Sequence, residues 1–298
     1  MKRKSRLAKA DLQVLISIPV ILAAAVGIAA AGSQTGFTIF GLPIFALCVF
    51  LAFFIQWIAF IPAFLNSTEA FYDLIGSITY LTLVVLALIW SPVIDIRSCL
   101  LSGLVSIWAV RLGSFLFFRT RAVGEDRRFR GIKTSFTRFL LTWTLQGLWV
   151  NFTLAAALSA ITSLTKSEMG LIELIGFLLW LLGFSLEVIA DLQKTRFNAS
   201  PENSNQFIRT GLWSWSRHPN YFGEIILWIG IAIIALPVLR GWQLLTLISP
   251  LFVVLLLTRI SGIPMLEVRA DEKWGSQADY QEYKAKTAIL IPLPPSKR

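Results

Sequence analysis

The residues with the most chemical potential lie in one short segment, GLWSWSRHPNYFGEIILW, at residues 211–228. His218-Pro219 favours an extended or turn conformation, so a new helix is expected to begin near Asn220. Asn220 and Glu224 would then lie one turn apart at the start of that helix, where the helix dipole favours anionic groups such as phosphates. An interfacial aromatic belt would explain the tryptophans but not Asn220 with Glu224. Further donors and stacking surfaces in the segment are Trp213, Trp215, Arg217 and Tyr221.

A second group of polar residues precedes this segment at helical spacing. Four residues fall at i, i+4, i+7 and i+11, and these offsets place them on one stripe of a continuous helix. They are Glu187, Asp191, Lys194 and Asn198. Because Glu187 lies within an apolar run, a polar cavity for a ligand, or a pore lining, is favoured over a surface salt-bridge ladder.

These groups must be positioned by membrane-spanning helices. The chain has 298 residues, 56% hydrophobic and 15% charged, a composition that excludes a water-soluble globular domain. A helix needs about 20 apolar residues to cross about 30 Å of hydrocarbon. We therefore predict an all-α polytopic membrane bundle with about eight transmembrane helices, within a range of seven to ten, as a single integral membrane domain over 1–298. The predicted spans are roughly 14–31, 41–65, 71–91, 99–118, 139–161, 171–190, 222–239 and 242–261.

Basic residues gather on one side of the predicted spans. With a cytoplasmic N-terminus, 23 of the 27 Lys and Arg residues fall in cytoplasmic segments, as the positive-inside rule expects. The net charge of +10 is thereby explained without nucleic acid as a partner. Both termini are then expected in the cytoplasm, where the mixed-charge tail from residue 264 onward would form a helical cap. The first apolar run is longer than that of a secretory signal, which favours an uncleaved anchor.

Some enzyme classes lack the residues they need. One histidine and two cysteines within apolar runs, Cys48 and Cys99, cannot build a zinc site, so no metal is expected. The G-x-S-x-G, G-x-G-x-x-G and G-x-x-x-x-G-K-[ST] motifs are also missing from the sequence. The residues alone therefore predict a cytoplasm-facing polar cavity for an anionic, aromatic ligand.

Five motifs carry a family resemblance. They are WAVRLGSFLFFR (108–119), GEDRRF (124–129), ADLQK (190–194), SRHPNYFGE (216–224) and SGIPMLE (261–267). Through them the chain resembles bacterial membrane proteins, a domain family of unknown function, that are grouped with the C-terminal domain of steroid 5-alpha-reductase (3-oxo-5-alpha-steroid 4-dehydrogenase). That resemblance covers nearly the whole chain. The resemblance to the characterised steroid 5-alpha-reductases and sterol C14 reductases covers 185–292, which implies a reductase-like cofactor-binding region there.

The resemblance implies that NADPH is the cofactor. By motif, the contacts expected for it are Asp191, Lys194, Asn198, Trp213, His218, Asn220, Tyr221, Glu224, Glu267, Trp274 and Tyr283. The chain departs from the pattern at Asn198, where sterol reductases carry arginine. In steroid reductases a Glu and a Tyr from earlier helices polarise the ketone of the substrate. By position and chemistry, Glu69 and Tyr72 are assigned this catalytic role.

The implied reaction transfers a hydride from NADPH to the β-carbon of an electron-poor alkene, while a Tyr or Glu proton stabilises the enolate. The protein would be an NADPH-dependent oxidoreductase acting on CH-CH groups of a steroid-like, terpenoid or fatty enone. The bilayer would supply the lipophilic substrate laterally, so membrane lipid is an expected partner. The expected location of the protein is the bacterial inner (plasma) membrane.

Two alternatives stay open. Membrane methyltransferases of the isoprenylcysteine carboxyl type also carry an R-H-P-x-Y turn and an E-x(n)-Y-x-x-Y-K tail, and they bind S-adenosylmethionine. A non-enzymatic lipid-binding or transport protein is the third interpretation, although it would predict two related halves and the sequence has no such internal symmetry.

Overall fold

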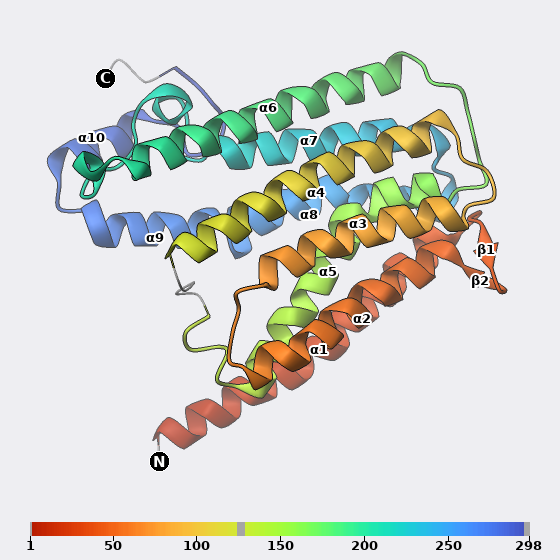
Figure 1. The fold of residues 1–298 in the computed structure, drawn as a ribbon, viewed down its shortest axis with the longest axis horizontal. Coiled ribbons are helices and arrows are strands. Elements are labelled where there is room, and N and C mark those ends of the chain that lie inside the picture. Colours follow the sequence, from red (N-terminus) through yellow and green to blue (C-terminus); the bar gives the residue numbers. More distant parts are fainter. Residues whose placement is uncertain (1, 124–128, 295–298) are drawn as a thin grey trace. The chain divides into compact units, whose positions relative to one another are not determined.

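The computed structural model describes residues 2–123 and 129–294, so all of the GEDRRF motif except Phe129 lies outside the described residues. Helices dominate it, and a two-residue β-hairpin, β1 (Thr38–Ile39) with β2 (Leu42–Pro43), joins the first two of them. The helices are α1 (Lys2–Ser33), α2 (Ile44–Leu65), α3 (Tyr72–Trp90), α4 (Ile96–Val123), α5 (Phe136–Ile161), α6 (Leu171–Ala199), α7 (Pro219–Ala235), α8 (Ile248–Leu255), α9 (Ile263–Trp274) and α10 (Ala278–Lys286) (Figure 1).

The prediction of an all-α polytopic bundle is confirmed. Within the described residues, eight helical segments are long and apolar enough to cross a membrane. The chain is therefore an integral, multi-pass membrane protein. The first seven segments begin within a few residues of the predicted spans, but α6 continues past the expected end at 190 to Ala199.

The eighth segment is not the single α-helix expected over 242–261. A 3₁₀-helix covers Gly241–Leu247, α8 follows, and a π-helical turn covers Leu256–Ile260. Pro250 has no N–H to donate to the preceding turn, so it fits an α-helix only in the first turn, where that N–H would have no partner. The α-helix α8 accordingly begins at Ile248, two residues before Pro250. In the π-turn, Ser261 N–H donates to the Leu256 carbonyl at 2.9 Å, five residues back.

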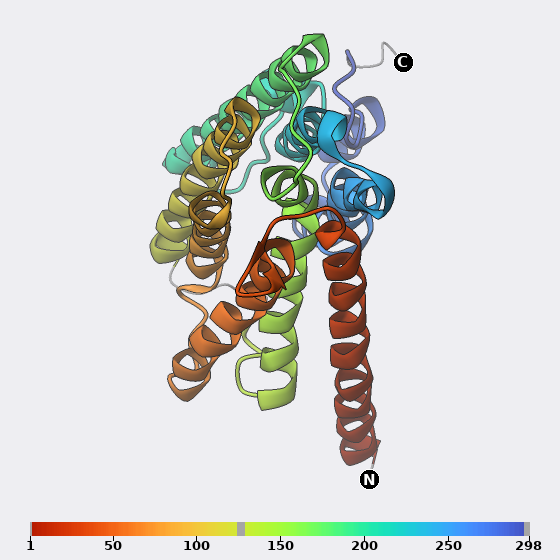
Figure 2. The same cartoon turned by 90° about the vertical axis from the view of Figure 1, so that its right-hand side faces the viewer.

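The chain forms two compact units. Unit 1 comprises Met1–Met169 with Ala235–Ser249, and unit 2 comprises Gly170–Ile234 with Pro250–Arg298. In unit 1, α1, α2 and α5 pack side by side, and α3 packs against α2, α4 and α5 (Figure 2). The earlier expectation of a single integral membrane domain over 1–298 stays a prediction.

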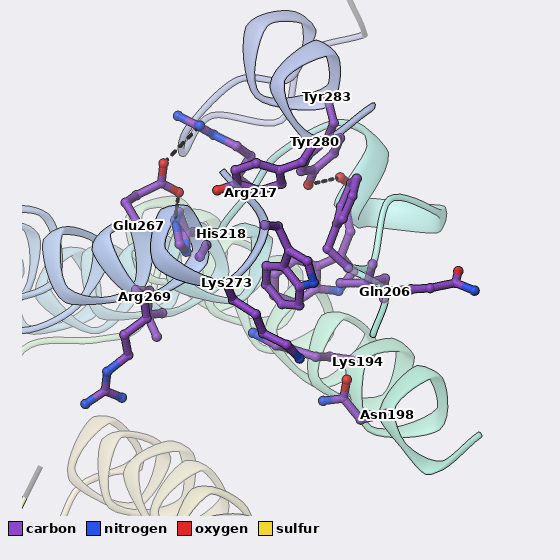
Figure 3. A pocket seen from close by; sticks show the side chains of 16 residues that line it. Lys194, Asn198, Gln206, Arg217, His218, Glu267, Arg269, Lys273, Tyr280 and Tyr283 are labelled. Carbon is purple, nitrogen blue, oxygen red and sulfur yellow. Dashed lines mark hydrogen bonds and ion pairs between the residues drawn. The ribbon is translucent and has the colours of Figure 1, made fainter. Parts of the chain in front are cut away.

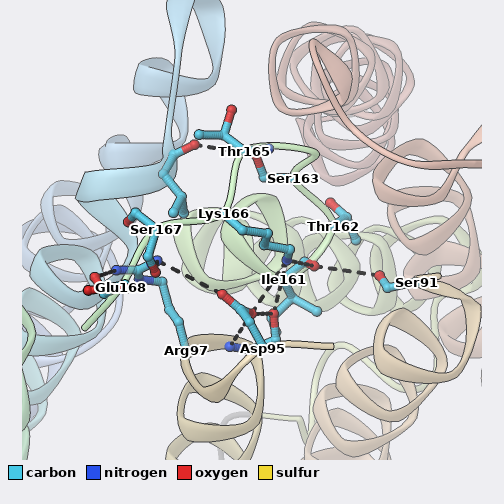
Figure 4. Close-up of polar contacts among 12 residues, drawn as sticks. Ser91, Asp95, Arg97, Ile161, Thr162, Ser163, Thr165, Lys166, Ser167 and Glu168 are labelled. Carbon is cyan, nitrogen blue, oxygen red and sulfur yellow. Dashed lines mark hydrogen bonds and ion pairs between the residues drawn. The ribbon is translucent and has the colours of Figure 1, made fainter. Parts of the chain in front are cut away.

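Charged residues tie together one end of unit 1 (Figure 4). Asp95 caps the start of α4 by accepting from Ser98 N–H at 3.0 Å. Lys166 lies 3.5 Å from the Asp95 carboxylate and donates to the Ile161 carbonyl at the end of α5. Opposite charges at the two helix ends complement the helix dipoles, so this cluster fixes α4 against α5.

In unit 2, glycines let α6 and α7 approach backbone to backbone. A Cβ atom built at Gly223 would lie 2.6 Å from the Gly183 carbonyl oxygen, and one built at Gly230 would lie 2.5 Å from that of Gly176. On each helix the two glycines are seven residues apart, so they lie on the same face and the close contact repeats along it. Small residues allow such close approach in membrane helix pairs. A larger side chain at these positions would force the two helices apart.

This contact can be tested by adding one methyl group. We expect Gly223→Ala to lower the free energy of unfolding by about 1–3 kcal/mol, because the added Cβ overlaps the α6 backbone. Gly103→Ala is the matched control, since no atom lies within 4 Å of its added Cβ. At position 103 alanine, which favours a helix more than glycine does, should raise the free energy of unfolding by about 0.5–1 kcal/mol. Thermal unfolding of the detergent-purified variants would measure both, and equal midpoints would contradict the close contact.

Candidate cofactor site

The end of α6 and the loop before α7 form one wall of a cavity in unit 2. The Trp213 indole N–H donates to the Ala190 carbonyl of α6 at 3.0 Å. The Gln193 side chain accepts from Leu212 N–H at 3.0 Å, next to Gly211, whose φ of +61° favours glycine. These bonds hold the loop against the last turns of α6, which carry Lys194 and Asn198.

A carboxylate on α9 binds the residues that precede α7. Glu267 forms an ion pair with Arg217 and contacts the His218 ring, each through an N–O distance of 2.9 Å. Lys284 of α10 lies 3.9 Å from the same carboxylate and is held by Asp271 at 2.6 Å. Glu267 therefore joins α9, α10 and the loop before α7.

Aromatic rings form the floor of the cavity. Phe207 lies with its ring centroid 5.2 Å from that of Tyr280, 5.3 Å from that of Tyr283 and 6.0 Å from that of Trp274. The Tyr283 hydroxyl donates to the Trp213 carbonyl at 2.7 Å. These contacts fix the α10 rings against the loop that carries Trp213.

The cavity has a volume of about 280 Å³ (Figure 3). Four cationic residues line it, and Glu267 is the one acidic residue among its lining side chains. In Figure 3 the side chains of Lys194 and Lys273 project toward one end of the cavity, and Arg217 and His218 lie at the other. Its full lining is Lys194, Asn198, Gln206, Phe207, Ile208, Trp213, Arg217, His218, Leu266, Glu267, Arg269, Ala270, Lys273, Trp274, Tyr280 and Tyr283.

Two indole faces in the cavity already carry ammonium groups. Lys194 Nζ lies 4.6 Å from the centre of the Trp213 ring, and Lys273 Nζ lies 4.6 Å from that of Trp274. Such cation–π contacts hold each lysine along the ring without neutralising its charge. The aromatic walls are therefore electropositive.

Burial sets the protonation of three groups at the site. It lowers the pKa of His218 below the usual 6.5, and the Glu267 carboxylate opposes this only in part. His218 is therefore neutral at pH 7 and donates its Nε2 proton to Glu267. Burial raises the pKa of Tyr280 to about 12, with Asp271 adding to the effect, and raises the pKa of Tyr283 further. Both hydroxyls stay protonated.

The structure brings most of the expected cofactor residues to this cavity. Those that line it are Lys194, Asn198, Trp213, His218, Glu267, Trp274 and Tyr283. The other four are not among its lining residues. Asn220 donates to Asp191 at 3.2 Å, Tyr221 stacks on the His218 ring at 5.7 Å, and Glu224 is buried on α7. Their expected contact with a cofactor stays a prediction.

The two expected catalytic residues belong to unit 1. The Tyr72 hydroxyl donates to the Thr142 carbonyl at 3.0 Å. The Glu69 carboxylate is buried and forms an ion pair with Lys133 at 2.9 Å. These bonds give both residues a packing role, and their catalytic role stays a prediction.

Sequence analysis missed several lining residues. Arg269, Ala270 and Lys273 line the cavity from α9, and Phe207 and Tyr280 supply rings. Helical spacing from Glu267 would have placed Ala270 and Trp274 on the same face, and Lys273 beside them. Among residues 2–123 and 129–294, no three His, Cys, Asp or Glu side chains cluster closely enough to hold a metal ion.

The fold and cavity define a polytopic helical membrane protein with a cationic, aromatic pocket at one end of its α6–α7 helix pair. Residues 59–287 match the family described as "Protein of unknown function (DUF1295)". The chain belongs to this family, which is part of the steroid 5-alpha-reductase-like group. The resemblance inferred from the motifs is thereby confirmed.

Curated relatives match over shorter regions. The chain is 34% identical over 95 residues to the protein-S-isoprenylcysteine O-methyltransferase of Saccharomyces cerevisiae, which is 31% of this chain and 35% of the relative. It is 29% identical over 121 residues to 3-oxo-5-alpha-steroid 4-dehydrogenase 1 of Rattus norvegicus, which is 40% of this chain and 41% of the relative. The matches thus span about two-fifths of these relatives or less. No solved structure matches the chain significantly.

His218 makes a pH-dependent contribution that can be isolated, because it is the only histidine of the chain. Its pKa is lowered in the folded state and returns to about 6.5 on unfolding. Above that pH its contribution to stability is complete. Below it the unfolded chain binds a proton that the folded chain does not, so stability falls by at most about 1.4 kcal/mol per pH unit.

Thermal unfolding of wild type and His218→Gln between about pH 7.5 and about pH 5.5 would measure this contribution. We expect a steeper loss of stability in the wild type, since the variant has no group with an ordinary pKa near 6.5. Parallel curves would show that His218 is not buried as described.

Proposed function

We propose that the protein is an NADPH-dependent membrane reductase of an activated carbon–carbon double bond in a lipophilic substrate. The observation that supports this most is the charge of the unit 2 cavity. Lys194, Arg217, Arg269 and Lys273 line it against the single carboxylate of Glu267. Lys and Arg side chains bind phosphate oxygens well, and NADPH carries a diphosphate and a 2′-phosphate.

The aromatic walls suit the planar parts of the same cofactor. Trp213, Trp274 and the two tyrosines offer flat faces and hydroxyl or indole edges for adenine or nicotinamide rings. The Lys194 and Lys273 ammonium groups lie over the indoles, where they could turn toward a phosphate. The residues present therefore fit a phosphorylated dinucleotide.

The chain's own residues have separable roles in the proposed reaction. NADPH supplies the hydride for the β-carbon of the alkene. Lys194 and Lys273 would hold its phosphates, and neutral His218 would keep Glu267 and Arg217 in place beside it. Either Tyr72 or Glu69 is proposed to supply the proton that completes the reduction, in exchange for its present bond to Thr142 or Lys133. Glu69 would first have to take up a proton, because its ion pair with Lys133 holds it as a carboxylate.

The substrate and setting follow from the apolar surroundings. A steroid-like, terpenoid or fatty enone dissolved in membrane lipid would reach the protein within the bilayer. The distribution of Lys and Arg supports cytoplasmic termini and explains the net charge without nucleic acid as a partner. The bacterial inner membrane is proposed from the family resemblance.

A methyltransferase that uses S-adenosylmethionine is the second candidate, because the yeast relative matches at 34% identity. Indole faces can bind a sulfonium through cation–π contacts. In this cavity, however, four cationic side chains stand against one carboxylate, and this excess of positive charge would repel a cationic ligand. The cavity charge therefore favours the reductase.

Ligand-dependent thermal stability separates these functions. We expect NADPH to stabilise the detergent-purified protein by about 2.7 kcal/mol at about 100 times its dissociation constant, and S-adenosylmethionine to have no effect. Stabilisation by S-adenosylmethionine alone would overturn the proposal in favour of a methyltransferase. No effect from either would favour a non-enzymatic lipid-binding or transport protein.

The cationic residues can be tested in the same assay. Lys194→Gln or Lys273→Gln should weaken NADPH binding about tenfold, or about 1.4 kcal/mol, through loss of a charged contact to phosphate. Lys286→Gln is the matched control, because Lys286 pairs with Glu282 on α10 and does not line the cavity. Equal losses in all three would mean that net charge alone, not the cavity, attracts the cofactor.

The proton-donor assignment predicts a change in turnover without a change in binding. In the presence of a reducible enone, Tyr72→Phe should lower kcat about 10²–10⁴-fold, because only the hydroxyl is lost. NADPH binding, measured by thermal stability, should stay at the wild-type value. Unchanged kcat, or weakened NADPH binding, would assign Tyr72 a packing role only.

A further inference from the structure

The C-terminal segment 287–293 lies as a strap along the loop before α7. Ser216 and Ala288 form a parallel bridge, in which Arg217 N–H donates to the Ala288 carbonyl at 2.9 Å. The Ser216 hydroxyl donates to the Leu290 carbonyl at 2.8 Å, and Leu293 N–H donates to the Trp215 carbonyl at 3.1 Å. The strap is therefore fixed to unit 2 by backbone and side-chain bonds.

The outward face of the strap is entirely apolar. Ile289, Ile291 and Leu293 alternate along it with exposed fractions of 45%, 57% and 54%. The Trp215 side chain beside them is 47% exposed. A strand with one face in water normally carries polar residues there, so this face is built for an apolar environment.

The position of the strap indicates which environment covers it. Trp215 precedes Pro219, the first residue of the α7 span, by four residues, so it lies within about 13 Å of the start of that span. Tryptophan is enriched near the ends of membrane spans, where lipid headgroups meet acyl chains. In sequence, Lys284 and Lys286 precede the apolar run and Lys297 and Arg298 follow it, a pattern that favours anionic headgroups.

We propose that the strap and Trp215 form an interfacial anchor that inserts Ile289, Ile291 and Leu293 into the headgroup boundary of the bilayer that α7 enters. The lipid would be an anionic phospholipid surface. The proposal does not depend on the proposed function.

Spin labels on single cysteines would test the anchor in nanodiscs of phosphatidylcholine and phosphatidylglycerol. In a Cys99→Ala background, where the remaining Cys48 is fully buried and out of reach of the label, labels would be placed by Ile289→Cys and Ile291→Cys, both at exposed positions that should not disturb folding. Leu290→Cys, on the half-buried side, tests the alternation. Glu282→Cys on exposed α10 is the water-facing control.

We expect labels at 289 and 291 to collide severalfold more often with oxygen, which dissolves in lipid, than with a water-soluble nickel chelate. The control at 282 should show the reverse, and the label at 290 should be protected from both. Equal nickel access at 291 and 282 would overturn the anchor. Protection from both reagents at 289 and 291, with spin–spin broadening between copies, would overturn it in favour of a protein contact.

Discussion

The backbone contact between α6 and α7 is the constraint on which unit 2 depends. Gly183 and Gly223 remove the side chains that would separate the helices, and Gly176 with Gly230 repeats the contact further along. In a bilayer no hydrophobic effect draws helices together, so close van der Waals packing must hold the pair. Once α6 and α7 are fixed, the end of α6 and the loop that leads into α7 are also fixed, and both line the cavity. The chemistry at the cavity thus depends on glycines outside it.

Electrostatics then decides what the cavity can bind. A single carboxylate, Glu267, orients Arg217 and His218 and leaves an excess of cationic side chains on the lining. Burial keeps His218 neutral, so its bond to Glu267 positions the carboxylate without adding another positive charge. The relatives include both a reductase and a methyltransferase, so similarity alone does not choose between them. The excess of positive charge on the lining is the feature of this chain on which the proposed choice of a phosphorylated cofactor rests.

The sequence predicted the spans well because hydrocarbon thickness imposes a minimum apolar length on each. It also predicted Lys194, Trp213 and Glu267 at the site, since motif and helical spacing place them near helix ends. It did not show that Asp191 and Asn220 bond to each other outside the cavity lining, because that depends on how α6 and α7 are rotated against each other. The break in the eighth span was missed for a similar reason: hydropathy records apolar length but not the backbone change before Pro250.

The five residues from Trp215 to Pro219 connect the proposed anchor to the cavity lining. Trp215 is exposed beside the strap, Ser216 bonds to the strap, and Arg217 and His218 contact Glu267. Pro219 then begins α7. Because this segment is short and bonded at both ends, Trp215 and the cavity have little freedom to move independently. Anchoring Trp215 at the headgroups would therefore also fix the depth of the cavity in the bilayer. The proposed lipophilic substrate would lie at a defined depth in the bilayer, and a cavity held at constant depth would suit the proposed reaction with it.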